Sequence, residues 1–202
     1  MNAAGINQGT SGNVSVRDAA GTGFLITPSG VPYDDLAPAD MVRVAIADGA
    51  SAGPLKPSSE WRMHRDIYAA RPEAGAVVHT HSIHCTALAC RREGIPAFHY
   101  MVAVAGGPDI RCADYETFGT QALSDHMLAA LDGRKACLLA NHGMICFEVT
   151  ARKALALAVE VETLARQFCA ARQLGEPVLL SEAEMAEVLE LFKAYGEQPA
   201  RR

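Results

Sequence analysis

Three of the seven histidines follow or end short apolar segments in a way that suits metal binding. His79 and His81 are separated by one residue and come directly after the apolar run Ala76-Val77-Val78. Alternate side chains of a β-strand point to the same side, so both imidazoles are expected to face one point. His142 follows a second apolar run and precedes a glycine. Three imidazoles, with a fourth position left for water, substrate or a carboxylate, are typical of a catalytic zinc site.

Spacing alone leaves simpler interpretations open. A His-x-His pair at a strand end can serve hydrogen bonding only. Glu60 can be an acidic residue in the first turn of a helix, or a carboxylate whose pKa a nearby metal sets so that it moves a proton. His64, His84 and His126 fall in predicted helices, where we expect solvation or hydrogen bonds around a site instead of metal binding. For His99 both roles stay open.

Three clusters of small and hydroxyl-bearing residues have the composition of anion sites. Glycine lets the backbone approach a phosphate, hydroxyls donate to it, and a helix N-terminus adds its dipole. For each cluster alone, an ordinary turn or helix cap is the alternative. The third cluster directly precedes Glu60, which would place a phosphate beside the metal. The clusters are Gly9-Thr10-Ser11-Gly12-Asn13, Thr27-Pro28-Ser29-Gly30 and Ser58-Ser59.

Alternating strands and helices are expected to position these residues. Serines are predicted to cap the helices that begin near Ser58 and Ser82, and Ser181 with Glu184 forms a capping box. The mixture predicts a layered α/β or α+β domain. Strands are predicted at 13–17, 23–27, 74–81, 135–140 and 144–148, and helices at 58–71, 82–92, 115–131, 150–174 and from 181 onward. The helix 150–174 shows an apolar stripe of Ala151, Leu155, Ala158, Val161, Leu164, Ala165 and Phe168.

Composition narrows the class of protein. The chain has 202 residues, 50% of them apolar, and a formal net charge of −5. This predicts one domain over residues 1–202 with a full core. The mild charge argues against a nucleic-acid partner, and no apolar stretch is long enough to span a bilayer. The N-terminus shows no secretory signal and the six cysteines form no CxxC pair, so we expect a cytoplasmic protein with reduced thiols.

Taken in order, these motifs resemble the class II aldolase/adducin family. Within it, the similarity is greatest to the members that cleave L-fuculose 1-phosphate, and it extends over nearly the whole chain. The motifs are Asn7–Ser15 (NQGTSGNVS), Leu25–Gly30 (LITPSG), Ser58–Trp61 (SSEW), Val77–Ser82 (VVHTHS) and Asn141–Gly143 (NHG). Further segments are His99–Met101, Ala105–Gly107, Thr117–Thr120 and Phe192–Gly196.

The resemblance implies a fold, an assembly and a metal site. The fold would be a three-layer α/β/α arrangement, in which a central, mainly antiparallel sheet is flanked by helices. The assembly would be a homotetramer with active sites between subunits. His79, His81 and His142 would bind one zinc ion per subunit, and Glu60 would complete the resting site and then act as an acid–base catalyst.

The resemblance also implies a reaction. A ketose 1-phosphate, with L-fuculose 1-phosphate as the expected substrate, would be cleaved to dihydroxyacetone phosphate and L-lactaldehyde. Zinc, as a Lewis acid, would stabilise the enediolate of this retro-aldol step, and Tyr100 would take the hydroxyl proton of the breaking bond. The positions matching those that hold the phosphate are Gly12, Asn13, Ser29, Gly30, Ser58 and Ser59. Those near the aldehyde end are Phe118, Phe192 and Tyr195.

Two features depart from the family pattern. Family members carry a helix before the Asn-Gln-Gly-Thr motif, whereas this chain starts only a few residues ahead of it, so that helix is expected to be absent or truncated. Asn141 stands where the fuculose enzymes have a histidine. That histidine is no zinc ligand, so the metal site is kept and the specificity is left open.

Related activities are alternatives. An aldolase for 5-deoxyribulose or methylthioribulose 1-phosphate needs the same zinc and phosphate residues and differs only in its aldehyde pocket. Ribulose-phosphate 4-epimerases of the family carry Ser-Ser-Asp where this chain has Ser58-Ser59-Glu60, so Glu60 favours an aldolase. A dehydratase of methionine salvage is a third alternative. Adducin-type binding modules lose the metal ligands, which this chain keeps.

Overall fold

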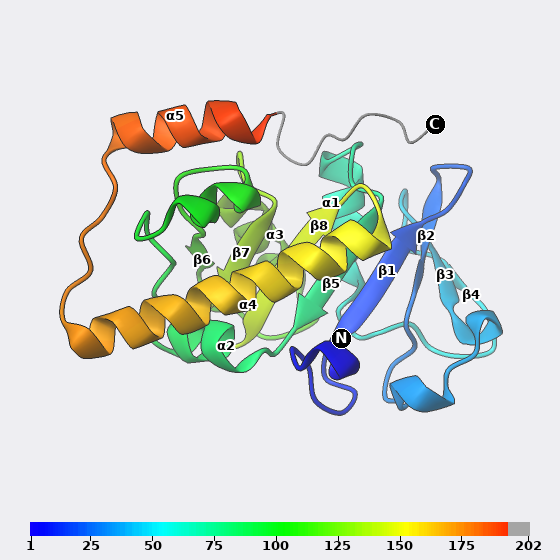
Figure 1. The fold of residues 1–202 in the computed structure, drawn as a ribbon. Coiled ribbons are helices and arrows are strands. Elements are labelled where there is room, and N and C mark those ends of the chain that lie inside the picture. The colour runs from blue at the N-terminus through cyan, green and yellow to red at the C-terminus, as the bar shows by residue number, and fades with distance from the viewer. Residues whose placement is uncertain (194–202) are drawn as a thin grey trace, which may run out of the picture.

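One eight-stranded sheet organises residues 1–193, the part of the chain that the computed structural model describes (Figure 1). The strands lie in the order β4-β3-β2-β1-β5-β8-β7-β6, and each neighbouring pair is antiparallel except β6 and β7. The expected, mainly antiparallel sheet is therefore confirmed. The strands are β1 Asn13–Arg17, β2 Gly23–Ile26, β3 Val42–Ala45, β4 Ser51–Ala52, β5 Ala76–Thr80, β6 Cys112–Ala113, β7 Ala136–Leu139 and β8 Gly143–Glu148.

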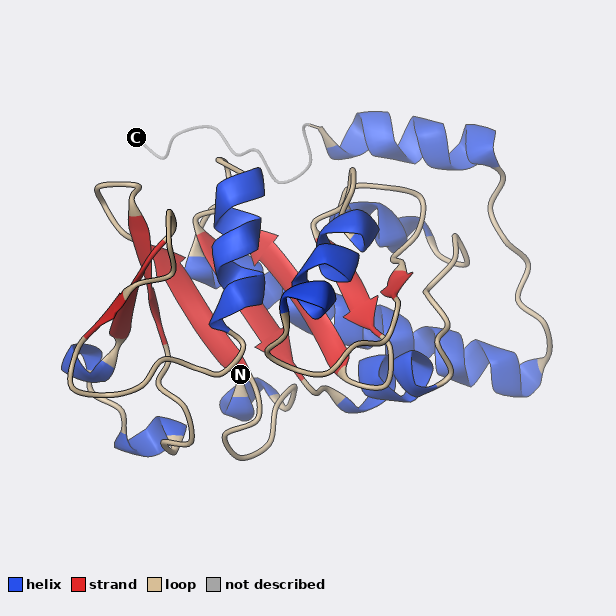
Figure 2. Ribbon diagram, turned by 180° about the vertical axis from the view of Figure 1, so that it is seen from behind, coloured by secondary structure: helices blue, strands red, loops and turns tan. Residues whose placement is uncertain are grey.

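Helices cover both faces of the sheet, which confirms the predicted three layers. α2 and α4 lie on one face (Figure 1), and α1 and α3 lie on the other (Figure 2). No helix within residues 1–193 is long and apolar enough to cross a membrane. The helices are α1 Trp61–Ala70, α2 Ile83–Cys90, α3 Gln121–Ala130, α4 Ala151–Leu174 and α5 Glu182–Phe192, with the 3-10 helices η1 Asn2–Ala4, η2 Tyr33–Asp35, η3 Pro38–Asp40 and η4 Tyr100–Ala105.

The central strand β5 is buried along its whole length. Ala76 and Val78 belong to the core under α2 and α4, whereas Val77 belongs to the core under α1 and α3. A strand covered on both faces reads as a continuous apolar run, which explains the sequence before the first histidine. At the end of β5, Asn13 of β1 pairs with His79, and Met144 of β8 pairs with Thr80. The neighbouring strands thus hold this strand end from both sides.

The helix predicted over residues 115–131 begins later than expected. α3 starts at Gln121, and the Thr120 side chain caps it by accepting the backbone N–H of Leu123 at 3.2 Å. The residues before Thr120 form a loop that carries Phe118. A threonine at the N-cap satisfies one of the free N–H groups of the first turn, and this signal competes with the helix-like pattern before it.

The apolar stripe of α4 differs from the predicted one in its first two turns. Ala151 is exposed and Leu155 is half-buried, whereas Ala154 and Leu157 are buried. Ala154 and Leu157 belong to the same core as Cys146 of β8, whose thiol donates to the carbonyl oxygen of Ala154 at 3.4 Å. The later stripe positions are buried as predicted: Ala158, Val161, Leu164, Ala165 and Phe168.

Of the caps predicted for two other helices, one is confirmed and one is wrong. Ser181 and Glu184 form the predicted capping box of α5. Ser82 is the N-cap residue of α2, but its hydroxyl makes no capping hydrogen bond. The Glu162 carboxylate of α4 does this instead, because it accepts the backbone N–H groups of His84 and Cys85, each at 2.9 Å. A carboxylate at a helix N-terminus is favoured by the helix dipole.

Leu138→Ala is expected to destabilise the fold, since Leu138 of β7 is 0% exposed in the core under α4. Removing a buried leucine side chain costs about 2–5 kcal/mol, through lost burial and the cavity left behind. Urea unfolding at fixed metal concentration measures the loss. The control is Leu174→Ala, at a side chain 93% exposed, for which a change within about 0.5 kcal/mol is expected. Equal losses for both variants would contradict the assigned core.

Candidate metal centre

Four side chains from three separate segments of the sequence converge at one end of the sheet. Glu60, His79, His81 and His142 each offer one ligand atom, and these atoms all lie within 4.8 Å of one another. Glu60 precedes α1, His79 lies in β5 with His81 just after it, and His142 lies in the turn between β7 and β8. The three imidazole rings stand edge to face, with centroids 4.8 to 5.0 Å apart. The predicted grouping is therefore present.

The contacts leave the same nitrogen of each ring facing the centre. His79 Nδ1 lies 2.9 Å from the carbonyl oxygen of Met144, so Nδ1 carries the hydrogen and Nε2 is left for a ligand. His79 Nε2 lies 3.1 Å from His81 Nε2 and 3.2 Å from Glu60 Oε2. His142 Nε2 lies 3.0 Å from Glu60 Oε1. Three Nε2 atoms and one carboxylate thus surround a common point.

This group of donors fits a divalent metal ion. Glu60 Oε1 is buried and makes no hydrogen bond of acceptable geometry, although His142 Nε2 lies close to it. A buried carboxylate oxygen without a hydrogen bond is costly, unless a cation takes that place. Three imidazole nitrogens and a carboxylate are the donor set that zinc and similar ions prefer. We therefore describe the four residues as a divalent metal site.

The electrostatics of the group show how strongly its members interact. Burial raises the pKa of Glu60, but the charges and close contacts of His79 and His142 outweigh burial and hold this pKa well below its ordinary value. Burial lowers the pKa of His79, but the charge of Glu60 and the hydrogen bonds to Glu60 and Met144 together raise it more, so the net shift is upward. Burial and the two neighbouring imidazoles lower the pKa of His81 to about 4. The carboxylate is therefore ionised at neutral pH.

The local backbone turns Glu60 inward. The prediction of a serine cap with Glu60 in the first helical turn is wrong, because Glu60 itself is the N-cap residue of α1 and its side chain makes no capping hydrogen bond. Its backbone N–H donates instead to Ser58 Oγ at 3.3 Å. The carboxylate is thus free of the helix end and points at the histidines.

Two unusual backbone positions place His142. Asn141 before it has φ 53°, a left-handed conformation that asparagine tolerates better than most residues. Gly143 after it has no room for a side chain, since a Cβ there would lie 2.4 Å from the carbonyl oxygen of Thr80 and 3.0 Å from the ring of His81. The turn therefore brings β8 close to the end of β5, and His142 next to His81.

The three predicted anion clusters meet beside this site. The loop of the second cluster is tied to the third, because Ser29 donates its N–H to Lys56 and Ser58 donates its N–H to Thr27, both at 3.1 Å. In the first cluster, Asn13 Nδ2 donates to Glu60 Oε2 at 2.9 Å. The clusters contain exposed groups, Ser29, Gly30 and Ser59, and buried ones, Gly12, Asn13 and Ser58. The three clusters can therefore form one anion-binding surface next to Glu60.

The other predicted site residues are not all near the metal group. Phe118 is 64% exposed, and the following Gly119 packs on the backbone of Ser59, the residue before Glu60. Tyr100 opens η4, whose last residue accepts the N–H of Lys135, just before β7. His142 follows the other end of β7, so Tyr100 lies at the far end of the sheet from the metal group. A single subunit therefore does not bring Tyr100 and Glu60 together.

The C-terminal helix α5 lies beside Tyr100 and not beside the metal group. α5 packs on η4 (Figure 1), and Phe192 lines a hollow of about 710 Å³ that also includes Val104 and Lys135. Phe192 thus shares the end of the sheet with Tyr100. Tyr195 lies outside the described residues.

Two further residues bear on the site: Tyr33, which sequence reasoning missed, and His64, for which it expected solvation or hydrogen bonds around a site. Tyr33 donates its hydroxyl hydrogen to the carbonyl oxygen of Gly12, which ties the segment after the second cluster to the first cluster. Burial and the charge of Glu60 raise the pKa of Tyr33 to about 12, so it remains a phenol. His64 is fully buried and contacts Asn13. Its position four residues after Glu60, one helical turn away, was the available signal.

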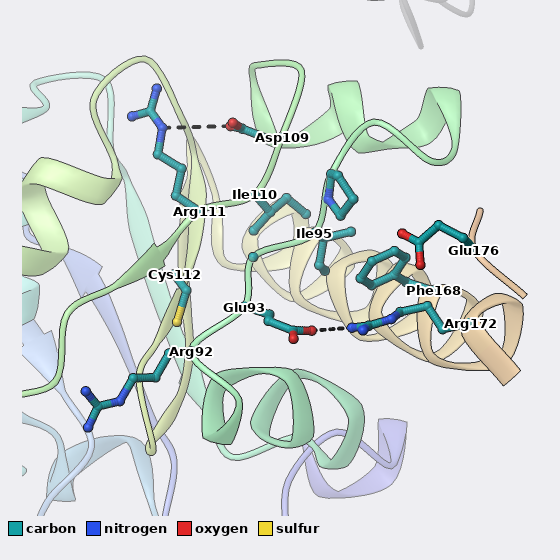
Figure 3. A pocket seen from close by; sticks show the side chains of 12 residues that line it. Arg92, Glu93, Ile95, Asp109, Ile110, Arg111, Cys112, Phe168, Arg172 and Glu176 are labelled. Carbon is teal, nitrogen blue, oxygen red and sulfur yellow. Dashed lines mark hydrogen bonds and ion pairs between the residues drawn. The ribbon is translucent and has the colours of Figure 1, made fainter. Parts of the chain in front are cut away.

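A second hollow, of about 640 Å³, lies beside β6, the strand at one edge of the sheet (Figure 3). Its cationic side chains already have partners in the structure. Arg172 pairs with Glu93, and Arg111 lies 3.8 Å from Asp109 (Figure 3). Arg92 donates to the side chain of Asn141 at 3.1 Å. We therefore assign the chemistry of the protein to the metal group and not to this hollow.

Comparisons with known proteins give a consistent set of similarities. The family model described as "Class II Aldolase and Adducin N-terminal domain" matches residues 1–169. A 5-methylthioribulose-1-phosphate/5-deoxyribulose-1-phosphate aldolase of Rhodospirillum rubrum is 58% identical, over 96% of this chain and 86% of its own length. An L-fuculose phosphate aldolase of Escherichia coli is 51% identical, over 97% of this chain and 90% of its own. A solved L-fuculose 1-phosphate aldolase superposes with a TM-score of 0.89 at 42% identity, covering 93% of this chain and 88% of that one.

His142→Ala is expected to abolish tight metal binding, because it removes one of three imidazole donors. Losing only an outer partner of a metal ligand typically costs 10–100-fold in affinity, so loss of a ligand is expected to exceed about 100-fold. Metal analysis after dialysis measures the occupancy. His126→Ala, in α3 and outside the group, is the control and keeps its metal. Full occupancy in His142→Ala would refute the assigned ligand.

Metal binding near pH 7 is expected to release a proton from His79. Its raised pKa means that His79 in the metal-free protein binds its second proton more tightly than an ordinary imidazole does, and the ion displaces this proton, whereas His81, with a pKa of about 4, has none to lose at neutral pH. Affinity therefore falls as the pH is lowered. Calorimetric titrations in buffers of different ionisation enthalpy count the released protons. A heat that is independent of the buffer would contradict this prediction.

Proposed function

The chain belongs to the class II aldolase and adducin family, and from this premise we propose that it is a zinc-dependent aldolase that cleaves a ketose 1-phosphate. At the coarser level it is a metal-dependent sugar-phosphate aldolase, an aldehyde-lyase. The observation that carries the proposal is the convergence of Glu60 with three histidines beside Asn13. We place the enzyme in the cytoplasm, which agrees with its six free cysteines.

The comparisons change the order of the candidate substrates. Sequence analysis put L-fuculose 1-phosphate first, and the relative of that activity is 51% identical. The relative named for 5-methylthioribulose 1-phosphate and 5-deoxyribulose 1-phosphate is 58% identical. We therefore place these two pentulose phosphates first and keep L-fuculose 1-phosphate as the second candidate. All three share carbons 1 to 3 and differ in the aldehyde they release.

The residues beside the metal group have separate tasks. When bound, the metal ion supplies a Lewis acid that draws charge from the carbonyl oxygen of the substrate. Glu60 accepts or returns a proton at the carbon that loses its bond, for which its ionised carboxylate is ready at neutral pH. The substrate phosphate is held by the residues proposed from the resemblance: Gly12, Asn13, Ser29, Gly30, Ser58 and Ser59.

Tyr100 would receive the hydroxyl proton that departs with the aldehyde. Because it lies at the far end of its own sheet, we propose that it serves the metal group of a neighbouring subunit, with Phe192 and Tyr195 beside the aldehyde. Tyr100 is 51% exposed in the isolated subunit, as such a role requires. Phe118 would contribute to the aldehyde pocket from the subunit that holds the metal. The proposed assembly is a homotetramer with one zinc per subunit and its active sites between subunits.

The substrate proposal is tested with a panel of ketose 1-phosphates. We expect the zinc-loaded protein to form dihydroxyacetone phosphate, and fastest from 5-deoxyribulose or 5-methylthioribulose 1-phosphate. Coupled oxidation of NADH by glycerol-3-phosphate dehydrogenase measures this product. Absence of dihydroxyacetone phosphate with every member would end the aldolase proposal, and formation of xylulose 5-phosphate from ribulose 5-phosphate would select an epimerase.

The shared active site is tested by mixing two inactive variants. Tyr100→Phe loses the proton acceptor, which is expected to lower kcat by about 10²–10⁴-fold, and His142→Ala loses the metal. Denatured together and refolded, the two chains are expected to recover activity, because some sites combine an intact Tyr100 with an intact metal group. Each variant refolded alone is the control. No recovery in mixed assemblies that form normally would place Tyr100 and the metal in one subunit.

A further inference from the structure

A chain of buried hydrogen bonds runs from Glu60 into the layer between α1 and β1. Beyond Glu60 its members are Asn13, His64, Ser15 and Tyr68, which are 2%, 0%, 1% and 2% exposed. Asn13 Nδ2 donates to Glu60 Oε2 at 2.9 Å, and Asn13 Oδ1 lies 2.5 Å from His64 Nε2. Ser15 Oγ lies 2.7 Å from His64 Nδ1 and 2.8 Å from the Tyr68 hydroxyl. The four residues thus connect the metal group to the interior.

The chain follows from the way that a helix faces a strand. Glu60, His64 and Tyr68 are four residues apart, which places them along one side of α1. Asn13 and Ser15 alternate in β1 and therefore point to the same side of the sheet. The two sets interleave along the contact between α1 and β1. A polar seam thus lies where two apolar surfaces would ordinarily meet.

The hydrogen atoms of this chain have only one consistent arrangement. The ionised carboxylate of Glu60 only accepts, so the NH₂ group of Asn13 faces it and Oδ1 faces His64. His64 Nε2 must therefore carry a hydrogen. Both of its ring nitrogens have uncharged partners, and burial lowers the pKa of His64 to about 3, so the ring is neutral. Its bare Nδ1 accepts from the hydroxyl of Ser15, which in turn accepts from Tyr68.

This arrangement locks the amide of Asn13. A flipped amide would turn its oxygen toward the carboxylate of Glu60 and its hydrogens toward the N–H of His64, which is repulsive on both sides. A buried polar network that is satisfied in a single arrangement is rigid for this reason. The second N–H of Asn13 has no hydrogen-bond partner within residues 1–193 and is left for another acceptor.

We infer that His64 is a positioning residue, supported by Ser15 and Tyr68. It holds the Asn13 amide so that one N–H fixes the Glu60 carboxylate and the other binds an oxygen of the substrate phosphate. The phosphate part of this inference rests on the proposed function. His64 touches neither metal nor substrate, and its effect passes through Asn13.

The first test is independent of catalysis. The ¹⁵N resonances of labelled histidine, with His64→Gln to assign them, report which ring nitrogen carries hydrogen. We expect His64 to be neutral with its hydrogen on Nε2 between about pH 5 and pH 9 in the metal-loaded protein. Hydrogen on Nδ1, or titration near the ordinary pKa of histidine, would overturn the inference.

The second test compares two buried serines. Ser15→Ala removes the donor that orients His64. Ser124→Ala removes a hydroxyl that is equally buried, at 0% exposed, but that donates to Asp66 between α3 and α1. We expect Ser15→Ala to weaken binding of inorganic phosphate, and to lower kcat/KM for the ketose 1-phosphate, by roughly tenfold, with metal content unchanged. Ser124→Ala is expected to change both by less than about twofold. Equal effects of both variants would show a structural role only.

Two further variants separate positioning from folding. His64→Gln keeps an N–H donor that reaches toward Asn13, whereas His64→Leu keeps bulk without a donor. Phosphate affinity in His64→Gln is expected to lie within a few-fold of wild type and well above that of Ser15→Ala, even if His64→Leu fails to fold. An affinity as low as that of Ser15→Ala would overturn the inference. If no ketose 1-phosphate is cleaved, the proposed function falls, while ring tautomer and phosphate affinity still decide the role of His64.

Discussion

The arrangement of this protein depends on one buried carboxylate, that of Glu60, among three imidazoles. Removing an ionised carboxylate from water is costly unless positive charge and hydrogen bonds replace the lost hydration. Here His79 and His142 supply the charge, Asn13 supplies a hydrogen bond, and a divalent ion fits the same point. Each of these partners comes from a different element, so the folded sheet end is needed to assemble them.

Two parts of the fold hold this end of the sheet in place, one through strand pairing and one through a helix–strand contact. The strands β5, β7 and β8 form a ladder buried on both faces, and their ends carry the histidines on rigid backbone. The contact between α1 and β1 carries Glu60 and Asn13, and it is polar along one seam through His64 and Ser15. A fully satisfied polar seam restricts the orientation of its members more than an apolar one, because each donor has only one suitable acceptor.

Under our proposal, the position of Tyr100 would let related enzymes act on different substrates with the same metal group. The candidate substrates share the phosphate, the carbonyl and the neighbouring hydroxyl, which under our proposal would meet the metal group and the serine and glycine loops. They differ in the released aldehyde, which would meet Phe118 and, under our proposal, Tyr100 and Phe192 of another subunit. Specificity can then change at the interface while the metal group and the α1–β1 contact stay the same.

The sequence by itself determined the features that depend on near neighbours. The alternation of a strand put His79 and His81 on one side, the capping box at Ser181 marked the start of α5, and the ordered motifs identified the family. Only the tertiary structure decided that Glu60 ends outside the first turn of α1, that Glu162 caps α2 in place of Ser82, and that Tyr100 lies away from the metal. These outcomes depend on which strands pair and which helices pack together. A local sequence pattern does not encode such long-range contacts, so these three outcomes follow only from the folded sheet.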